Sequence, residues 1–359
     1  MQRIFSVVKS QLKRLNLSRW AVLAMVMMGA IVACQGNFLP ARENTVSAPA
    51  ANCPTIAHAL GETKVCGQPQ RIVVLGPYLL ESLLALNVQP IGFADHIAFH
   101  QGDYTQPTEQ IPYLGQRISQ SVANVGIAYT PSIEAILKAQ PDLILGLDSN
   151  NAKQYQILAD IAPTLMLKWD EPEKNLRIIA QVLNRSEQAE QLLKQSREQI
   201  ALARQAFSSL VKTSPRLLLL SSAELQEIYI GTNTGLCSSL LTQLGFQLVV
   251  PPGFQLSQQT ALVPITVEAL PQLNHANLIV LLGNNFSGMN QFNGTNTFEE
   301  HQLSKLKQAW AKNPIAQALN ASQTGQVYFI PAYLCLGLPG PIGTDLYLNE
   351  LQHQLLPTR

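Results

Sequence analysis

The sequence predicts an α/β protein in which two lobes are joined by one long helix. Short apolar runs, such as 72–75 and 142–146, alternate with segments whose apolar residues recur at helical spacing, which is typical of parallel strands and their crossover helices. Residues 187–211 then contain neither glycine nor proline, and one helix of this length would measure about 37 Å. Strand-like runs resume after Pro215. Because such a helix is longer than one lobe needs, we expect it to bridge two.

The individual elements follow this alternation along the chain. In the first lobe we predict strands at 71–77, 90–94, 142–146 and 163–167, and helices at 79–86 and 131–137. The second of these helices has Thr130 as its predicted N-cap and Pro131 at its first position. In the second lobe we predict strands at 217–220, 228–230, 248–250, 278–282 and 326–330, and helices at 236–244, 267–273, 310–319 and 342–356. Ligands of such sheets bind beyond the carboxyl ends of the strands, so we expect a site between the lobes.

The composition is that of a folded protein without a strong net charge. Apolar residues make up 47% of the chain, charged residues make up 13%, and the formal net charge is +1. These values are typical of a globular domain with a large core and exclude a disordered chain. Beyond the N-terminus no cluster of lysine and arginine stands out, so we expect no nucleic-acid partner.

The N-terminus carries an export signal. Residues 1–19 contain five cations and no acid, and residues 20–32 are uncharged. This pattern indicates a secretory signal peptide at 1–33, because the apolar run is shorter than the roughly 20 residues that span a bilayer. The tetrapeptide at 31–34 resembles the lipobox of bacterial lipoproteins, which predicts a lipid on Cys34. Residues 34–52 then form a flexible tether. An uncleaved signal anchor is the alternative.

Export changes the interpretation of the cysteines, because thiols tend to pair in an oxidising compartment. Cys53 and Cys66 flank a short segment with Gly61 between them, so we predict a hairpin closed by a disulfide. Cys237 and Cys335 either pair across the second lobe or are buried as small apolar side chains. Cysteine spacings that bind zinc are absent from the sequence.

Residues 70–92, which read QRIVVLGPYLLESLLALNVQPIG, carry a family resemblance. They resemble the opening of the periplasmic binding proteins for ferric siderophores, ferric citrate and cobalamin. Weaker matches follow in the same order, at 131–136 with 140–144, at 229–232 with 240–245, and at Trp310 with Pro314 and 326–328. The resemblance implies the class III periplasmic binding protein fold, in which one long helix joins two Rossmann-like lobes. The expected domains are a first lobe at 53–172, a helical linker at 173–213 and a second lobe at 214–359.

The resemblance also implies a function and its partners. Proteins of this family deliver a solute to the permease subunits of an ABC importer, so we expect a monomeric protein that is not an enzyme, without a cofactor, on the periplasmic face of the cytoplasmic membrane. Its expected ligand is an iron(III)–siderophore or ferric citrate, with cobalamin and haem as alternatives. In the family each lobe offers an acid to permease arginines. Glu81 matches the first, whereas Ser239 precedes Leu240 and Leu241 where the second glutamate often stands.

A chelate that already surrounds its iron needs aromatic and apolar walls, with cations if it is anionic, rather than metal ligands from the protein. Loops that follow predicted strands are where such side chains should lie. The expected ligand-binding residues are Tyr78, Tyr113, Arg117, Lys168, Trp169, Asn233, Asn285 and Tyr333. Many relatives carry an arginine where Pro339 precedes Gly340. The missing cation weakens the case for a highly anionic ligand such as ferric citrate and leaves a hydroxamate chelate, haem and cobalamin open.

A metal site and a hydrolase are two other chemistries that the sequence could serve. Asp95, His96 and His100 lie close enough in sequence to share a metal, but the other histidines are scattered, so we expect no metal site. A lipid-anchored α/β hydrolase is the alternative from a different class, and an adhesion or scaffold lipoprotein is a third. The Gly-x-Ser-x-Gly turn of such hydrolases is absent, since Ser287-Gly288 lacks the first glycine, and we expect no catalytic residue.

Overall fold

The structure, a computed structural model, describes residues 53–253, 262–287 and 298–356. It contains two six-stranded sheets and one two-stranded hairpin. We call each six-stranded sheet with its helices a lobe. The signal peptide expected at 1–33, the lipidation site Cys34 and the tether expected at 34–52 lie outside the described residues. No helix in the described part of the chain is both long and apolar enough to cross a membrane.

The first sheet is built on a buried central strand. Its order is β6-β5-β4-β3-β7-β8, and all neighbouring pairs are parallel except β5 with β6. β3 is buried along its whole length, as its continuous apolar sequence predicts. The strands are β3 (Ile72–Leu75), β4 (Gly92–Asp95), β5 (Ala123–Ile127), β6 (Thr130–Pro131), β7 (Leu143–Leu147) and β8 (Thr164–Leu167). The helices are α2 (Pro77–Ala85), α3 (Pro107–Gln110), α4 (Ile133–Ala139), α5 (Asp148–Asn151) and α6 (Tyr155–Ala159), with a 3-10 turn η1 (Gly115–Arg117).

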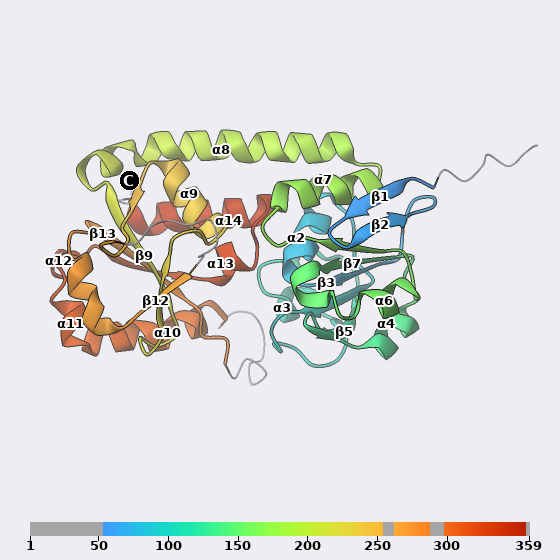
Figure 1. Cartoon of the computed structure of the whole chain (residues 1–359), viewed down its shortest axis with the longest axis horizontal. Helices are drawn as coiled ribbons and strands as arrows, with labels where there is room; N and C mark the ends of the chain where they lie inside the picture. Colours follow the sequence, from blue (N-terminus) through green and yellow to red (C-terminus); the bar gives the residue numbers. More distant parts are fainter. Residues whose placement is uncertain (1–52, 254–261, 288–297, 357–359) are drawn as a thin grey trace, which may run out of the picture. The chain divides into compact units, whose positions relative to one another are not determined.

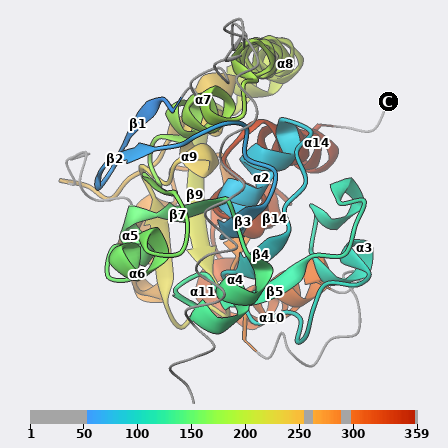
Figure 2. The ribbon, with the colours of Figure 1, turned by 90° about the vertical axis from the view of Figure 1, so that its right-hand side faces the viewer.

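An unbroken helix follows the first sheet. After α7 (Pro172–Val182), α8 runs for 28 residues, Ser186–Thr213, which corresponds to about 42 Å. It contacts α7 near one end and packs on the second-lobe helices α9 and α14. Figure 1 shows it lying along both sheets, and Figure 2 shows α7 and α8 on the same side of the first sheet. The long helix predicted between the lobes is therefore present.

The second sheet is mixed. Its order is β12-β10-β9-β13-β14, with β11 also paired to β9, and β10 runs antiparallel to both of its neighbours. The strands are β9 (Arg216–Ser222), β10 (Ile228–Gly231), β11 (Gln247–Leu248), β12 (Leu262–Ile265), β13 (Leu278–Gly283) and β14 (Val327–Pro331). The helices are α9 (Leu236–Leu244), η2 (Val267–Leu273), α10 (Phe298–Lys312), α11 (Pro314–Gln317), α12 (Asn320–Gln323), α13 (Tyr333–Leu336) and α14 (Pro341–Leu355).

Two predicted helices were wrong in their bounds. The helix expected from Pro131 begins at Ile133, because Ser132 rather than Thr130 caps it and accepts a hydrogen bond from Ala135 N at 3.2 Å. The helix expected at 310–319 is divided, because Pro314 has no amide hydrogen for a continuous ladder and starts α11 instead. Asn313 caps this second helix through Ala316 N at 3.0 Å.

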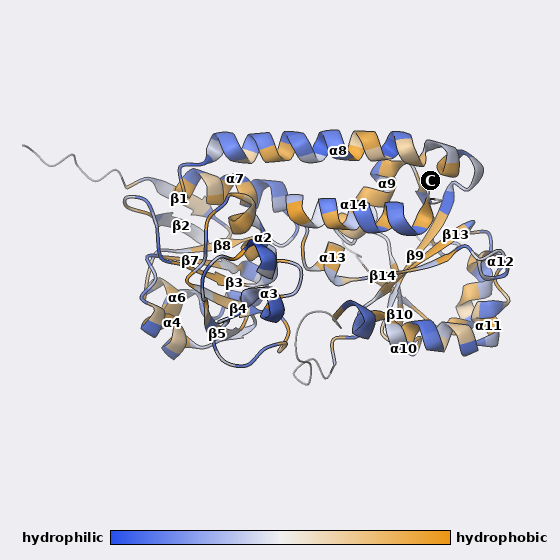
Figure 3. Ribbon diagram, turned by 180° about the vertical axis from the view of Figure 1, so that it is seen from behind, coloured by the Kyte–Doolittle hydropathy of each residue, from blue (hydrophilic) through white to orange (hydrophobic). Residues whose placement is uncertain are grey.

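Apolar side chains hold each sheet to its helices. Figure 3 shows hydrophobic residues concentrated in the strands of both lobes, while much of α8 is hydrophilic. One apolar cluster also crosses between the lobes, because Phe298, Tyr333, Leu338 and Ile342 of the second lobe pack with core residues of the first. The two lobes therefore share buried surface as well as a connecting helix.

Two disulfides are present among the described residues. Cys53 is bonded to Cys66 across the hairpin of β1 (Thr55–His58) and β2 (Gly61–Lys64), in which His58 faces Gly61. Cys237 of α9 is bonded to Cys335 of α13, so this pair takes the bonded alternative. The second disulfide joins two helices that follow different strands of the second sheet.

Candidate functional site

The carboxyl ends of strands from the two lobes face one another. The His96 ring, just after β4, lies 5.0 Å from that of Tyr333 after β14 and 5.9 Å from that of Phe286 after β13. Farther along the same interface Trp169 follows β8, and a Cβ placed on Gly235 after β10 would lie 3.6 Å from its ring. The structure therefore puts two sets of loops in contact where an α/β sheet usually binds its ligand.

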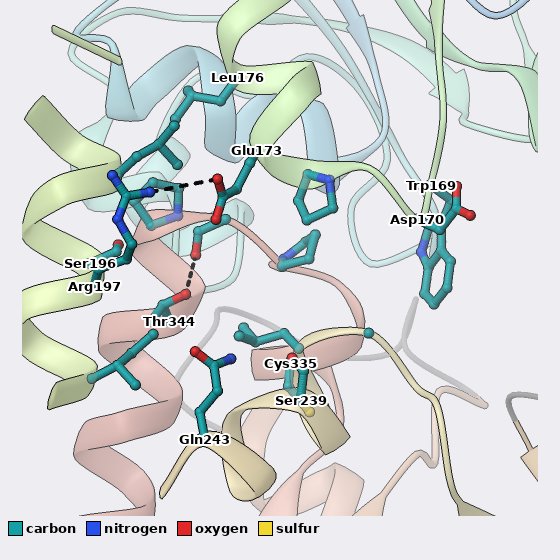
Figure 4. A pocket seen from close by; sticks show the side chains of 18 of the residues that line it. Trp169, Asp170, Glu173, Leu176, Ser196, Arg197, Ser239, Gln243, Cys335 and Thr344 are labelled. Atoms are coloured by element: carbon teal, nitrogen blue, oxygen red, sulfur yellow. Dashed lines mark hydrogen bonds and ion pairs between the residues drawn. The ribbon is translucent and has the colours of Figure 1, made fainter. Parts of the chain in front are cut away.

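A cavity of about 710 Å³ opens beside this interface, bordered by α7, α8, α9 and the start of α14. Its volume lies within the range of roughly 300–1,000 Å³ found for small-molecule sites. Trp169 of the first lobe, with 37% of its surface exposed, and Asn233 of the second lobe line it. Figure 4 shows Ser239 and Gln243 of α9 and Thr344 of α14 among its other walls.

Three charged side chains line the cavity, and two of them are acids. Asp170 follows Trp169, and Glu173 lies in the first turn of α7. The Oε2 atom of Glu173 is 3.7 Å from Nη1 of Arg197, an α8 residue, as the dashed line in Figure 4 marks. The one guanidinium in the lining therefore already has a carboxylate partner.

Tyr78 supports the loop that carries Trp169. Its hydroxyl donates to the Trp169 carbonyl oxygen at 2.7 Å, and Asn175 Nδ2 donates to the Lys168 carbonyl oxygen at 2.6 Å. Burial raises the pKa of Tyr78 well above its usual value, so the phenol stays neutral and remains a donor. The structure thus assigns Tyr78 a position behind the cavity wall rather than in it.

Tyr113 and Tyr333 belong to an aromatic contact between the lobes. Their rings lie 5.6 Å apart, and Phe298 lies 5.8 Å from Tyr113 and 5.1 Å from Tyr333. Tyr333 is fully buried, and burial raises the pKa of both phenols. We call the rings of His96, Tyr113, Phe286, Phe298 and Tyr333 the aromatic contact. In this arrangement Tyr333 has no exposed surface for a ligand.

The two expected cations do not line this cavity. Arg117 lies in a second cavity of about 370 Å³, between the end of α2, the middle of α8 and Asp345. Lys168 is exposed, with Nζ 3.8 Å from Oε1 of Glu171. Asn285 is buried and accepts a hydrogen bond from Ser287 Oγ at 2.7 Å. Of the eight expected residues, Trp169 and Asn233 are thus the two brought together in the cavity lining.

Glu81 is not on an exposed lobe tip, which corrects the position expected for permease docking. It is fully buried, and its carboxylate accepts hydrogen bonds from Gly340 N at 2.8 Å and Gly343 N at 2.6 Å, at the start of α14 in the other lobe. A Cβ on Gly340 would lie 3.1 Å from the carboxyl carbon, so glycine allows the close approach. We call this arrangement the Glu81 contact. A permease arginine cannot reach the carboxylate in this arrangement.

Burial and hydrogen bonding act on Glu81 in opposite directions. Loss of hydration raises its pKa to about 7, although the backbone N–H groups of Gly343, Gly340 and Ile342 and the charge of Arg117 lower it. The desolvation of the carboxylate therefore outweighs its favourable partners. The second lobe's Ser239, at the place of the second expected docking acid, lies in the cavity lining.

Sequence reasoning missed the walls that come from helices. Glu173, Arg197 and Gln243 lie on α7, α8 and α9, whereas the expected ligand-binding residues lie in loops that follow strands. Polar residues at helical spacing are normal on any exposed helix face, so no sequence signal separated these from their neighbours. The metal alternative gains no support, since no group of three His, Cys, Asp or Glu side chains in the described ranges is arranged to hold an ion.

Two lobes, a single linking helix and an inter-lobe cavity define the class of two-lobe solute-binding proteins, and comparison with known proteins agrees. The model of the family described as periplasmic binding protein matches residues 72–334. The chain belongs to this family of substrate-binding proteins.

Curated relatives and solved structures show the same likeness. The chain is 24% identical over 273 residues to the Fe(3+)-citrate-binding protein YfmC of Bacillus subtilis (strain 168), covering 75% of each. It is 27% identical over 264 residues to the Fe(3+) dicitrate-binding periplasmic protein FecB of Escherichia coli (strain K12), covering 72% of this chain and 76% of FecB. Staphylococcus aureus SirA complexed with staphyloferrin B superposes with a TM-score of 0.67 at 22% identity, over 84% of this chain and 98% of SirA. The predicted fold class is confirmed.

Proposed function

We propose that this protein captures an iron(III) chelate between its lobes and delivers it to the permease of an ABC importer. The observation that carries the proposal is the inter-lobe cavity of about 710 Å³ with Trp169 and Asn233 on opposite lobes. Relatives named for ferric citrate and siderophores support the same class of ligand. A ligand that touches both lobes stabilises one lobe arrangement, which a membrane partner can recognise.

The chemistry of the walls supports a preformed chelate rather than bare iron. The cavity lining combines an indole, amides, hydroxyls and apolar groups with two carboxylates and one guanidinium, and the described residues contain no cluster of metal ligands. Such walls recognise the organic shell of a complex through stacking and hydrogen bonds. A carrier of free metal ions would need several donors pointed at one centre.

We also propose that the mature protein is held at the outer face of the cytoplasmic membrane by a lipid on Cys34, as its sequence context predicts. Two of the relatives, YfiY and YhfQ, are described as lipoproteins. Cys34→Ser should release the protein into the soluble fraction and abolish labelling with a palmitate analogue. Continued labelling of the variant would remove Cys34 from this role.

The direct test is a thermal-shift and tryptophan-fluorescence screen of residues 53–359 with iron-loaded siderophores, ferric citrate, haem and cobalamin. A ligand that binds the folded state raises the melting temperature as its concentration exceeds the dissociation constant. We expect at least one iron chelate to bind at micromolar concentration while its iron-free form binds more weakly. Binding of haem or cobalamin alone would replace the ligand class, and a response to none of these compounds would refute the proposal.

A further inference from the structure

The charged groups between the lobes are few and mostly acidic. The charged residues of the cavity lining are Asp170, Glu173 and Arg197. Arg197 is paired with Glu173 at 3.7 Å. An anion that entered this space would meet one guanidinium that already has a partner and one carboxylate, Asp170, that repels it. The lining therefore has no surplus of positive charge.

The loops at the facing strand ends give the same result. After β3, β10, β13 and β14 the chain continues with uncharged residues, at 76–80, 232–235, 284–287 and 332–336. β4 ends at Asp95, which is 2% exposed, and Asp148 directly follows β7. The lysine after β8, Lys168, has Glu171 as a partner at 3.8 Å.

Other cations of the described residues are paired or lie elsewhere. Lys305 of α10 lies 3.8 Å from Glu224 in the loop after β9. Arg117 lines the second cavity, and its charge acts on Glu81 by lowering the carboxyl pKa. The two internal segments outside the described ranges, 254–261 and 288–297, contain no charged residue in the sequence, so neither adds a cation wherever it lies.

Charge decides which iron complexes such a space accepts. Iron(III) held by three hydroxamates is neutral, because each hydroxamate contributes one negative charge, whereas three catecholates leave three negative charges on the complex. Removing an anion from water costs several kcal/mol per charge unless cations or hydrogen-bond donors replace its hydration. Amide and indole groups such as Asn233, Gln243 and Trp169 suit a neutral complex with polar edges.

We infer that the chelate this protein binds carries no net negative charge, as in a ferric trihydroxamate. The inference rests on the proposed function and narrows its ligand class. It also differs from what the relatives' names alone would suggest, since the ferric dicitrate named for FecB is an anion and FeuA of Bacillus subtilis is described with a triscatecholate siderophore.

The test compares iron complexes that differ in charge. Titration of residues 53–359, followed by tryptophan fluorescence and calorimetry, would use ferrichrome as the neutral trihydroxamate, ferrioxamine B as a cationic one, ferric enterobactin as the tris-catecholate, and ferric dicitrate. We expect ferrichrome or ferrioxamine B to bind more than about tenfold tighter than either anion. The affinity of the protein for ferrichrome should change little when the salt concentration is raised from about 0.02 to 0.5 M, because screening acts on charge pairs and ferrichrome is neutral.

A variant provides an independent readout. Asp170→Asn removes a carboxylate of the lining and should raise the affinity for ferric enterobactin relative to that for ferrichrome by severalfold. Equal or tighter binding of ferric enterobactin or ferric dicitrate by the unmodified protein would overturn the charge inference and leave the proposed function standing. If none of the four complexes binds, while haem and cobalamin also fail, the proposed function itself is refuted.

Discussion

Two of the contacts between the lobes differ in chemistry. At the Glu81 contact a buried carboxylate of α2 holds two backbone N–H groups of α14. At the aromatic contact, five rings from loops and helices of both lobes meet with their centroids roughly 5–6 Å apart and without a shared ion pair. The first contact depends on two hydrogen bonds with fixed directions, whereas the second depends on buried area. The comparison indicates that the Glu81 contact fixes the relative orientation of the lobes near α14. The rings of the aromatic contact, at the strand ends, can repack.

The largest expected effect is the loss of the central ring of the aromatic contact. Tyr333→Ala leaves a void among packed side chains and should lower the free energy of unfolding by about 3–5 kcal/mol in urea denaturation. Tyr333→Phe is the matched control, because no hydrogen-bond partner of the buried hydroxyl is found among the described residues. It should change stability by less than about 1 kcal/mol. A large loss in the Phe variant would show that the hydroxyl has a partner.

The Glu81 contact should be next. Glu81→Ala leaves the N–H groups of Gly340 and Gly343 buried without acceptors and should cost about 2–4 kcal/mol of unfolding free energy. Glu62→Ala, on the exposed face of the hairpin, is a control for loss of a glutamate and should stay within about 0.5 kcal/mol. If both variants behaved alike, Glu81 would contribute nothing to lobe contact.

The same carboxyl should make stability depend on pH. Its pKa is raised by burial from 4.5 to about 7 in the folded protein, so the folded state holds the proton more tightly than the unfolded chain does. The stability that this difference supplies is fully present below about pH 4.5 and is lost as pH rises through about 7, on the order of 3 kcal/mol in total. Unfolding of the wild type and of Glu81→Gln at pH 4.5, 6 and 7.5 should show this fall in the wild type alone. If the free energy of unfolding fell equally with pH in both proteins, a group other than Glu81 would be responsible for the pH dependence.

The smallest effect on folding, and the most direct on binding, is expected at the cavity. Trp169→Ala should weaken chelate binding by on the order of 1–3 kcal/mol if the indole forms the wall, with little change in unfolding because the side chain is 37% exposed. Tyr129→Ala removes another exposed ring, at 50% exposure, that does not line the cavity. Equal affinities for wild type and Trp169→Ala in calorimetry would exclude Trp169 from the site.

Local pattern was enough to predict much of the fold. The long helix, most strands of both sheets and the hairpin between Cys53 and Cys66 depend on periodicity, glycine and proline, all of which act over a few residues. Strands β5, β6 and β12 were missed, and so was the early start of α10 at Phe298. β5 contains Gly126, β6 has only two residues and β12 contains Pro264, while the first turns of α10 have a mixed polar sequence.

The site was less predictable, because its contacts join distant parts of the chain. Glu81 and Gly343, whose N–H donates to its carboxylate, are 262 residues apart in the sequence. Nothing within the α2 sequence distinguishes an exposed glutamate from one that the other lobe covers. Trp169 and Asn233 were found because both follow strands, whereas Arg197 was not, because it lies in the middle of α8.

The disulfide of the first hairpin has a mechanical consequence. Cys53 is bonded to Cys66, so a pull on the chain ahead of residue 53 passes directly to the end of β2 and bypasses both strands of the hairpin. The hydrogen bonds that fix the hairpin to β8, from Ala59 N to the Met166 carbonyl oxygen and from Thr63 Oγ1 to the Thr164 carbonyl oxygen, are then spared from being peeled one by one. A force applied at the N-terminal end of the protein is therefore transmitted through a covalent bond into the first lobe.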